Sequence, residues 1–456
     1  MDSKGKGRGK TAIIVLAFII LIALVPWVFL VLNMFNEDEI AEPVPTPVGE
    51  SVMQPEPPEE PTSEPEPISE IPDEPDIDDY DDLDDITPIE ENIISLSTIH
   101  PELVAELNEI ASSYDSVAVS LVVFDGDTGE YFTFEFGYAD VGAGRRVDSS
   151  TKFRVASLAK LTTVICAMVL VDDGLIDLDT DISTYFGYEV SNTHFPGTPI
   201  TARMLMQHTS SIFDSGAFQQ SRERNSSESV RFLLDRGASF RRNQPGTVFE
   251  YSNFGYAVLG ALCERVSGMS IDALSRQVLF DPLGIDAAYI PEWLYDTENI
   301  AVIYSDTHAV TRSVQAQLEV GESDTPGHDL HLAQGNLTIS AVDFARILVM
   351  LGNRGTLDGV RILSPTSVRA MFNTDDQGAA FRQGLGLRFS DSDFIEGESY
   401  FWHTGSAYGM LSQFLYSAID NRGVIVVTTG ASGDRMESGL IDICTELALV
   451  AWKVFE

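Results

Sequence analysis

Hydrophobic positions along the chain follow two kinds of repeat, and the order of these repeats predicts the elements. Residues 116–124 and 130–137 are rich in β-branched and aromatic side chains and flank an Asp/Gly turn, which predicts a hairpin. Between this hairpin and the C-terminal region the apolar spacing is mostly helical. The predicted helices cover residues 157–170, 201–208, 228–236, 254–267, 271–279 and 340–351, with a final helix at 436–455, and β-type runs return at 400–404, 410–416 and 423–429.

This order predicts an α+β fold for one domain over residues 92–456. Because strands come first and last, the two groups can pair into one antiparallel sheet flanked by helices. The helices between them then form a second, mostly helical lobe. A groove between two such lobes is a common place for a binding site, so we expect the functional site to lie there.

A different pattern precedes this domain. Residues 12–32 form an uncharged, mostly apolar run, which at about 1.5 Å per residue spans a bilayer core of roughly 30 Å. Basic residues precede the run and acidic residues follow it, so the positive-inside rule predicts a cytoplasmic tail at 1–11 and an extracellular remainder. The run is longer than the apolar part of a signal peptide. We therefore expect an uncleaved, single-pass anchor in the cell membrane.

Residues 33–91 are predicted to be a disordered linker. The stretch 37–91 holds 22 acidic residues and 12 prolines but no lysine or arginine. Such a segment buries too little apolar surface to fold, and proline and charge repulsion keep it extended. Its predicted role is a spacer between the membrane and the folded domain.

Charge and cysteine usage exclude several kinds of function. The net charge of −42 argues against a nucleic-acid partner, because phosphate binding requires a basic surface. Cys166, Cys263 and Cys444 show no paired spacing and are predicted to be small buried hydrophobes. The histidines in segment 327–331 lack a further ligand at metal-site spacing, so we expect no metal and no other cofactor.

The first candidate for chemistry is the motif Ser157-Leu-Ala-Lys160 at the start of a predicted helix. Three residues apart, the two side chains lie on one helix face, so the amine can reach the hydroxyl. Serine is a weak nucleophile until a base takes its proton. Lysine can be that base only where burial or a neighbouring charge lowers its pKa. Alone, the motif is equally compatible with a capping serine and a surface lysine.

A second motif places Tyr251 and Asn253 after a Pro-Gly turn and before a predicted helix. A loop tyrosine close to a lysine can carry protons to and from a serine and its leaving group. The asparagine can also cap the helix that follows, and the tyrosine can equally serve in packing.

A third motif, His403-Thr404-Gly405-Ser406, lies in a late strand. The glycine lets a substrate lie against the strand edge. The backbone N–H of Ser406 can join that of Ser157 in an oxyanion hole. The same residues are also compatible with an ordinary strand end.

Taken together, Ser-x-x-Lys, Tyr-x-Asn about 95 residues later and a Thr-Gly strand about 150 residues further on resemble the serine β-lactamase and penicillin-binding-protein superfamily. The likeness is greatest to the branch of class C β-lactamases, DD-peptidases and related esterases. It covers about residues 98–455. Supporting stretches lie at residues 137–140, 153–160, 205–211, 251–260, 282–284 and 403–409.

The resemblance implies a division of labour among the motif residues. Ser157 would be acylated by an amide, lactam or ester carbonyl, with its proton managed by Lys160 and Tyr251. Asn253 would bind the side-chain amide of the substrate or help to position Lys160. The residues of the late strand would bind substrate, and water would release the acyl group with Tyr251 as the base. No metal is needed.

One departure bears on the substrate. Many β-lactamases of this superfamily carry lysine at the position of His403. With an ordinary pKa near 6.5, a histidine is a weaker and pH-dependent partner for an anion. The prediction is therefore a membrane-anchored extracellular serine hydrolase acting on a small-molecule or peptide substrate, cell-wall peptidoglycan among the candidates. A β-lactamase and a non-catalytic peptide sensor on the same fold remain the alternatives.

Overall fold

The computed structural model describes residues 92–456, apart from 224–229, 236–237, 322–329, 377–378 and 392–398. The expected tail at 1–11, anchor at 12–32 and linker at 33–91 lie outside the described residues, as do residues 327–329 of the histidine-containing segment. No helix within the described part is long and apolar enough to cross a bilayer.

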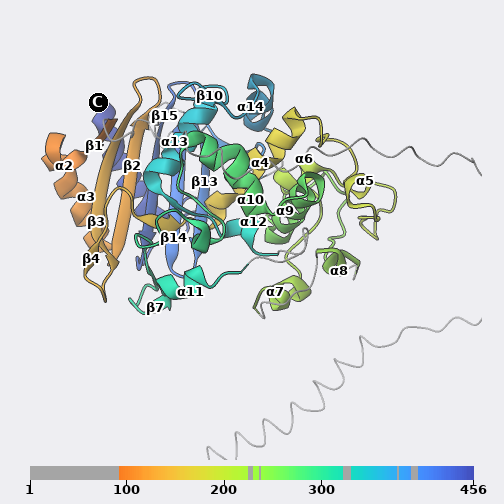
Figure 1. Ribbon diagram of the computed structural model, residues 1–456, viewed down its shortest axis with the longest axis horizontal. Helices are drawn as coiled ribbons and strands as arrows, with labels where there is room; N and C mark the ends of the chain where they lie inside the picture. The colour runs from red at the N-terminus through yellow and green to blue at the C-terminus, as the bar shows by residue number, and fades with distance from the viewer. Residues whose placement is uncertain (1–91, 224–229, 236–237, 322–329, 377–378, 392–398) are drawn as a thin grey trace, which may run out of the picture. The chain divides into compact units, whose positions relative to one another are not determined.

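One nine-stranded sheet organises the domain, with strand order β1-β3-β2-β15-β14-β13-β12-β11 and β4 paired to the outer part of β3 (Figure 1). The strands are β1 (Ile93–Ser95), β2 (Ala118–Asp125), β3 (Glu130–Asp140), β4 (Arg145–Arg146), β11 (Arg382–Gln383), β12 (Arg388–Ser390), β13 (Tyr400–Ala407), β14 (Met410–Ser417) and β15 (Arg422–Thr429).

The pairing of β2 with β15 joins the first hairpin to the last strands of the chain. The two strands run antiparallel from Ala118 opposite Thr429 to Asp125 opposite Arg422. The predicted α+β class and the pairing of the terminal strand groups are therefore confirmed. The sheet is mixed rather than purely antiparallel, because the short β1 lies parallel to β3.

Both faces of the sheet are covered, which is why its central strands read as almost continuous apolar runs. Val424 and Val426 of β15 face a layer formed with α3 (Pro101–Ser113) and α15 (Asp442–Trp452). Their neighbours Ile425 and Val427 face the opposite way, into the larger core that includes the helical lobe. Figure 1 shows the sheet between these two helical layers.

The helical lobe is built around α4 (Ala159–Asp172), whose residues are buried on nearly all sides. A helix that is apolar all round belongs in the interior. It packs against α9 (Asn253–Ser267) and α12 (Leu332–Gly335). The other helices of the domain are α2 (Leu96–Ile99), α5 (Ser183–Phe186), α6 (Ala202–Met206), α7 (Gly216–Glu223), α8 (Val230–Asp235), α10 (Ile271–Ser275), α11 (Val314–Leu318), α13 (Ala341–Gly352) and α14 (Pro365–Phe372).

One predicted helix boundary was wrong. The final helix begins at Asp442 rather than 436, because Arg435 pairs with Ile441 in an isolated bridge and Gly439 takes a φ of +90° within the intervening turn. The helix predicted at 271–279 is α10 followed by a π-helical turn, Arg276–Phe280. The predicted burial of the cysteines is confirmed, since all three are buried and free.

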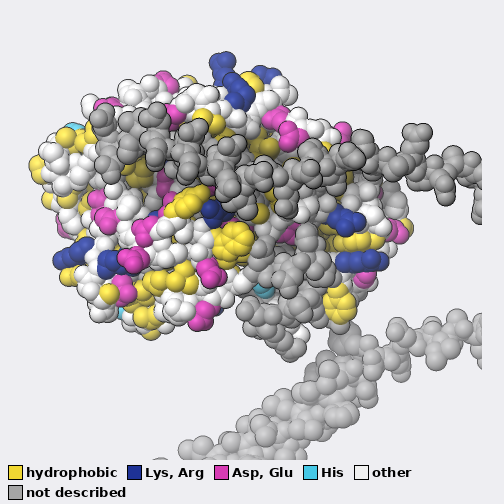
Figure 2. All heavy atoms as spheres, viewed as in Figure 1, with side chains coloured by type: hydrophobic (Ala, Val, Ile, Leu, Met, Phe, Trp, Pro, Cys, Tyr) yellow, Lys and Arg dark blue, Asp and Glu magenta, His cyan; other side chains and the backbone are white. Residues whose placement is uncertain are grey.

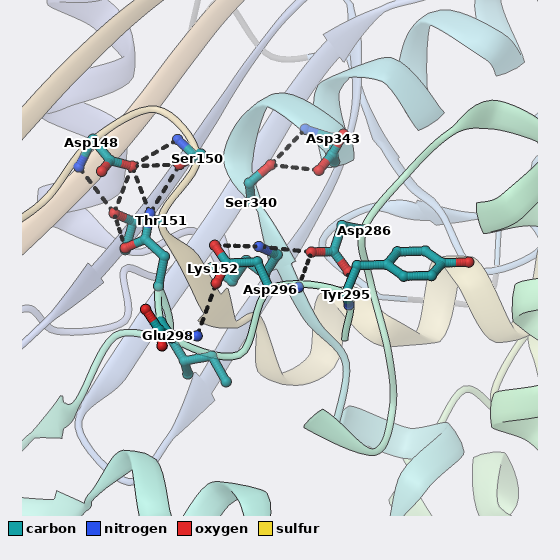
Figure 3. Close-up of polar contacts among 12 residues, drawn as sticks. Asp148, Ser150, Thr151, Lys152, Asp286, Tyr295, Asp296, Glu298, Ser340 and Asp343 are labelled. Carbon is teal, nitrogen blue, oxygen red and sulfur yellow. Dashed lines mark hydrogen bonds and ion pairs between the residues drawn. The ribbon is translucent and has the colours of Figure 1, made fainter. Parts of the chain in front are cut away.

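A polar cluster fixes the segment that leads to Ser157. Strand β5 (Lys152–Arg154) pairs with β8 (Thr338–Ser340). Lys152 is only 4% exposed, and its Nζ lies 2.9 Å from Asp286 Oδ2 (Figure 3). This buried ion pair ties β5 to the loop after α10, so the chain enters the turn at Ser157 from a fixed position.

On the molecular face in Figure 2, by contrast, charged side chains of both signs are scattered among apolar ones.

Candidate active site

Ser157 lies in a single 3-10 turn, Ala156–Leu158, that runs directly into α4. Ala156 has a φ of +46°, a left-handed conformation that costs an L-residue about 1–2 kcal/mol. The Ser412 hydroxyl of β14 donates to the Val155 carbonyl at 2.9 Å and holds this turn against the sheet. The turn presents a half-buried Ser157 at the junction of sheet and helical lobe.

Lys160, in the first turn of α4, is fully buried. Its Nζ donates to Ser157 Oγ at 3.2 Å, to Asn253 Oδ1 at 2.9 Å and to the Gln334 carbonyl at 2.6 Å. A lysine ammonium has three protons to donate, so these acceptors suit the charged form. Burial nevertheless lowers the pKa of Lys160, more than the nearby Tyr251 and Asp214 raise it.

Tyr251 lies on the other side of the serine, with its Oη 2.7 Å from Ser157 Oγ. Burial by itself raises the pKa of Tyr251, but the positive charges of Lys160 and Arg388 outweigh this effect and lower it from its ordinary value. The Ser157 hydroxyl thus lies between two groups whose proton affinities are both reduced. Tyr251 and Lys160 both lie within reach of the serine proton, and both are candidates for the base.

Asn253 is the first residue of α9, and Ser252 rather than Asn253 caps that helix, by accepting from the Gly255 N–H. Both polar atoms of the Asn253 side-chain amide form hydrogen bonds. Its Oδ1 accepts from Lys160, and its Nδ2 donates to Asp214 Oδ2 at 2.8 Å. Of the two roles expected for Asn253, the one visible in these contacts is the positioning of Lys160.

The edge of β13 from His403 onward borders the site. Strand β12 pairs with β13 only at residues 400–402, so among the described strands none covers the edge beyond Trp402. Tyr408 and Gly409 form a two-residue turn with φ values of +59° and +97°, and Ala407 pairs with Met410. In such a hairpin the N–H and C=O of Ser406 point away from β14, toward the site.

The structure requires glycine at position 405 for a different reason from the one predicted from the sequence. A Cβ at this position would lie 2.5 Å from the Val155 carbonyl oxygen and 3.1 Å from Ser157 N. The missing side chain therefore lets β13 itself lie against the nucleophile turn. The close approach brings the Ser157 and Ser406 backbones together, as an oxyanion hole built from their N–H groups requires.

His403 does not supply the expected pH-dependent charge. The ring is buried, and its Nδ1 lies 2.9 Å from the Thr404 carbonyl oxygen. Burial, assisted by the charges of Arg388 and Lys160, holds the pKa of His403 well below its ordinary 6.5. It is therefore neutral near pH 7. Two arginines that the sequence motifs did not indicate, Arg388 and Arg435, carry positive charge near this edge of the site.

Arg388 of β12 lies in an aromatic cage, with its guanidinium carbon 5.3 Å from the ring centre of Tyr251, 4.7 Å from that of Phe381 and 5.1 Å from that of Trp402. Burial lowers the pKa of Arg388 to about 10, so it stays charged at neutral pH. Among the described residues no carboxylate forms an ion pair with it. The charge is thus available to a ligand.

Arg435 supplies a second cation on the same face of the sheet. Its Nη1 donates to Thr404 Oγ1 at 2.8 Å. Arg388 lies opposite Trp402 in the sheet, and alternation along β13 puts Trp402 and Thr404 on one face. Arg435 therefore contacts Thr404 on the face where Arg388 contacts Trp402. Neither arginine belongs to a recognisable motif, and only the strand register brings Arg388 to the site.

Comparisons with known proteins give matches at the level of family, sequence and fold. The family described as Beta-lactamase matches residues 102–442. Penicillin-binding protein 4 of Amycolatopsis lactamdurans is 29% identical over 344 residues, or 72% of this chain and 84% of that protein. An octameric penicillin-binding protein homologue from Pyrococcus abyssi superposes with a TM-score of 0.61 at 21% identity over 78% of this chain and 77% of its own. A class C beta lactamase from Rhodobacter sphaeroides gives 0.60 at 19% identity over 77% and 99%.

Proposed function

The chain belongs to the beta-lactamase family, and from its site we propose that it is a serine hydrolase that forms an acyl-enzyme on Ser157. The proposed substrate is a cell-wall peptide or a related amide or ester. The proposed setting is the outer side of the membrane, with residues 12–32 as the anchor and 33–91 as the spacer. That setting is supported only by the sequence of residues 1–91.

One observation carries the proposal. Ser157 Oγ lies 2.7 Å from Tyr251 Oη and 3.2 Å from Lys160 Nζ, within hydrogen-bonding reach of both. A nucleophile, a base with a lowered pKa and a fixed cation in contact with one another are the parts that acyl transfer needs. A binding protein that never reacts has no need of a buried lysine beside a half-buried serine.

In the proposed acylation the Tyr251 phenolate takes the Ser157 proton while Oγ attacks the substrate carbonyl carbon. The carbonyl oxygen becomes an oxyanion held by the N–H groups of Ser157 and Ser406. Tyr251 then gives its proton to the leaving amine or alkoxide, and the bond to the leaving group breaks. In deacylation Tyr251 takes a proton from water and the hydroxide attacks the acyl carbon. The bond between that carbon and Ser157 Oγ then breaks, the acid is released, and Tyr251 returns the proton to Oγ. The Lys160 ammonium stabilises the phenolate throughout.

The two arginines favour a substrate with a carboxylate on its leaving-group side. Arg435 contacts Thr404 and Arg388 contacts Trp402 on the same face of β13, and a guanidinium binds a carboxylate in a fixed, bidentate geometry. The C-terminus of a peptide has such a group, and so do β-lactam drugs. The charge distribution therefore supports both the peptidase and the β-lactamase alternative, and a substrate panel must separate them.

The test uses the full chain and its Ser157→Ala variant. Incubation with a fluorophosphonate should add one covalent adduct to the wild type, located at Ser157 by peptide mass spectrometry, and none to the variant. Equal labelling of both proteins, or of neither, would refute the acyl-enzyme. Relative turnover of a D-alanyl peptide, a carboxylated ester and a chromogenic cephalosporin then assigns the substrate class. Tight peptide binding without turnover, unchanged in Ser157→Ala, would instead favour a sensor.

A further inference from the structure

Asp214 lies in the segment between α6 and α7, and its carboxylate contacts the start of α9. Its Oδ2 accepts from Asn253 Nδ2 at 2.8 Å. Its Oδ1 accepts from the Phe254 N–H at 2.8 Å and from the Ser252 hydroxyl at 3.3 Å. No sequence motif indicated this residue, because it acts across about 40 positions of chain.

These contacts decide which way the Asn253 amide points. An ionised carboxylate only accepts hydrogen bonds, so the NH₂ group of Asn253 must face Asp214. The amide oxygen is then left facing Lys160, whose Nζ donates to it at 2.9 Å. The reversed amide would turn its NH₂ group toward the Lys160 ammonium and its oxygen toward the Asp214 carboxylate. Donor would then face donor and acceptor would face acceptor. The Lys160 ammonium would also lose one of its three acceptors.

We propose that Asp214 is a positioning residue for acylation, which orients the Asn253 amide so that its oxygen holds the Lys160 ammonium beside Ser157. This proposal rests on the serine hydrolase function proposed above. Asp214 touches neither the nucleophile nor the expected position of the substrate. Besides its charge, which raises the pKa of Lys160, Asp214 acts through the hydrogen bond that it accepts from Asn253, which in turn accepts one from Lys160.

A purely structural role must be separated from this one, because Asp214 also accepts the Phe254 N–H at the first turn of α9. Asp214→Asn makes the separation possible. The new side chain keeps one oxygen for Phe254 but presents an NH₂ group to the NH₂ group of Asn253. Either the Asn253 amide reverses, or the contact is lost. If the amide reverses, Lys160 loses one of its three acceptors. If the contact is lost, nothing holds the Asn253 oxygen toward Lys160. In both cases the helix keeps its acceptor.

The reciprocal exchange provides the rescue. In the double variant Asp214→Asn with Asn253→Asp, the amide at position 214 donates to the new carboxylate at position 253. The other oxygen of that carboxylate can again accept from Lys160. The single variant Asn253→Asp instead places two carboxylates within hydrogen-bonding distance of each other. Asp181→Asn is the matched control, since Asp181 Oδ1 accepts the Ser183 N–H at 2.9 Å outside the site.

The experiment measures the second-order rate constant of fluorophosphonate labelling and the thermal midpoint for each full-length protein. A loss of alignment at a reacting group costs on the order of 100-fold in rate. We expect about that loss for Asp214→Asn with little change in midpoint, at least tenfold recovery in the double variant, and no change for Asp181→Asn. An Asp214→Asn rate within threefold of wild type, or a double variant no faster than Asp214→Asn, would overturn the proposal. A wild type that fails to label would overturn the proposed function itself, and this inference with it.

Discussion

Removal of the Arg388 charge should shift the pH dependence of acylation in a predictable direction. The Arg388 guanidinium carbon lies 5.3 Å from the Tyr251 ring centre. At that distance, an effective dielectric constant of 20 gives an attraction to the phenolate of about 3 kcal/mol, equivalent to about 2 pKa units. Because the cation favours the phenolate, Arg388→Met should raise the pKa of Tyr251. The acidic limb of the acylation profile should then move about one to two units toward higher pH, with a rate loss of about 10- to 100-fold on that limb.

The assay must separate this effect from substrate binding, because Arg388 is also expected to bind a carboxylate. Labelling by an uncharged fluorophosphonate avoids that contact, and rates between pH 5 and 10 define the limb. Arg388→Lys is the matched variant, since it keeps a positive charge near the ring and should stay within half a unit of wild type. If the Arg388→Met and wild-type limbs coincide on the pH axis, the phenolate is not the base stabilised by this charge.

Four further outcomes follow from the described contacts. Gly405→Ala should reduce the labelling rate at least 100-fold and destabilise the domain by about 1–3 kcal/mol, because the added Cβ overlaps the nucleophile turn. The labelling rate checks the first value, and urea titration checks the second. Lys152→Met should lower the free energy of unfolding by about 1–3 kcal/mol, because the part-exposed Asp286 carboxylate loses its contact with the buried Lys152 amine. Lys453→Met, at an exposed ion pair, should change it by less than about 1 kcal/mol in the same titration. Cys166, whose pKa burial raises to about 12, should react with Ellman's reagent at pH 8 only after denaturation.

The parts that could be predicted from the sequence are those set by local spacing. Ser157 and Lys160 are three residues apart, so any helical turn brings them together. Gly405 and its neighbours lie on one strand, and the sequence shows which of their side chains point to the same face of the sheet. Tyr251 joins this group because the beginning of α9 lies against the beginning of α4, where Asn253 accepts from Lys160. The family likeness predicted this proximity, but spacing alone did not.

The parts that could not be predicted depend on tertiary register. Arg388 reaches the site because β12 pairs with β13 so that Arg388 stands opposite Trp402. A shift of one residue would turn its side chain to the other face. Asp214 meets Asn253 only after the loop between α6 and α7 has folded onto α9. Neither residue is part of a periodic pattern, so nothing in the linear sequence separates them from surface charges.

His403 stands where many β-lactamases of this superfamily carry lysine, and this difference changes which residues supply the positive charge of the site. A lysine at position 403 would add a third basic group close to Lys160 and Arg388. His403 is neutral instead, so the positive potential at Tyr251 comes from Lys160 and Arg388 alone. Both keep their charge when His403 is neutral, and the guanidinium keeps it well above neutral pH. The anion-binding strength of the site should therefore not fall as pH rises through 6.5, which is the opposite of what the histidine in the strand motif predicts.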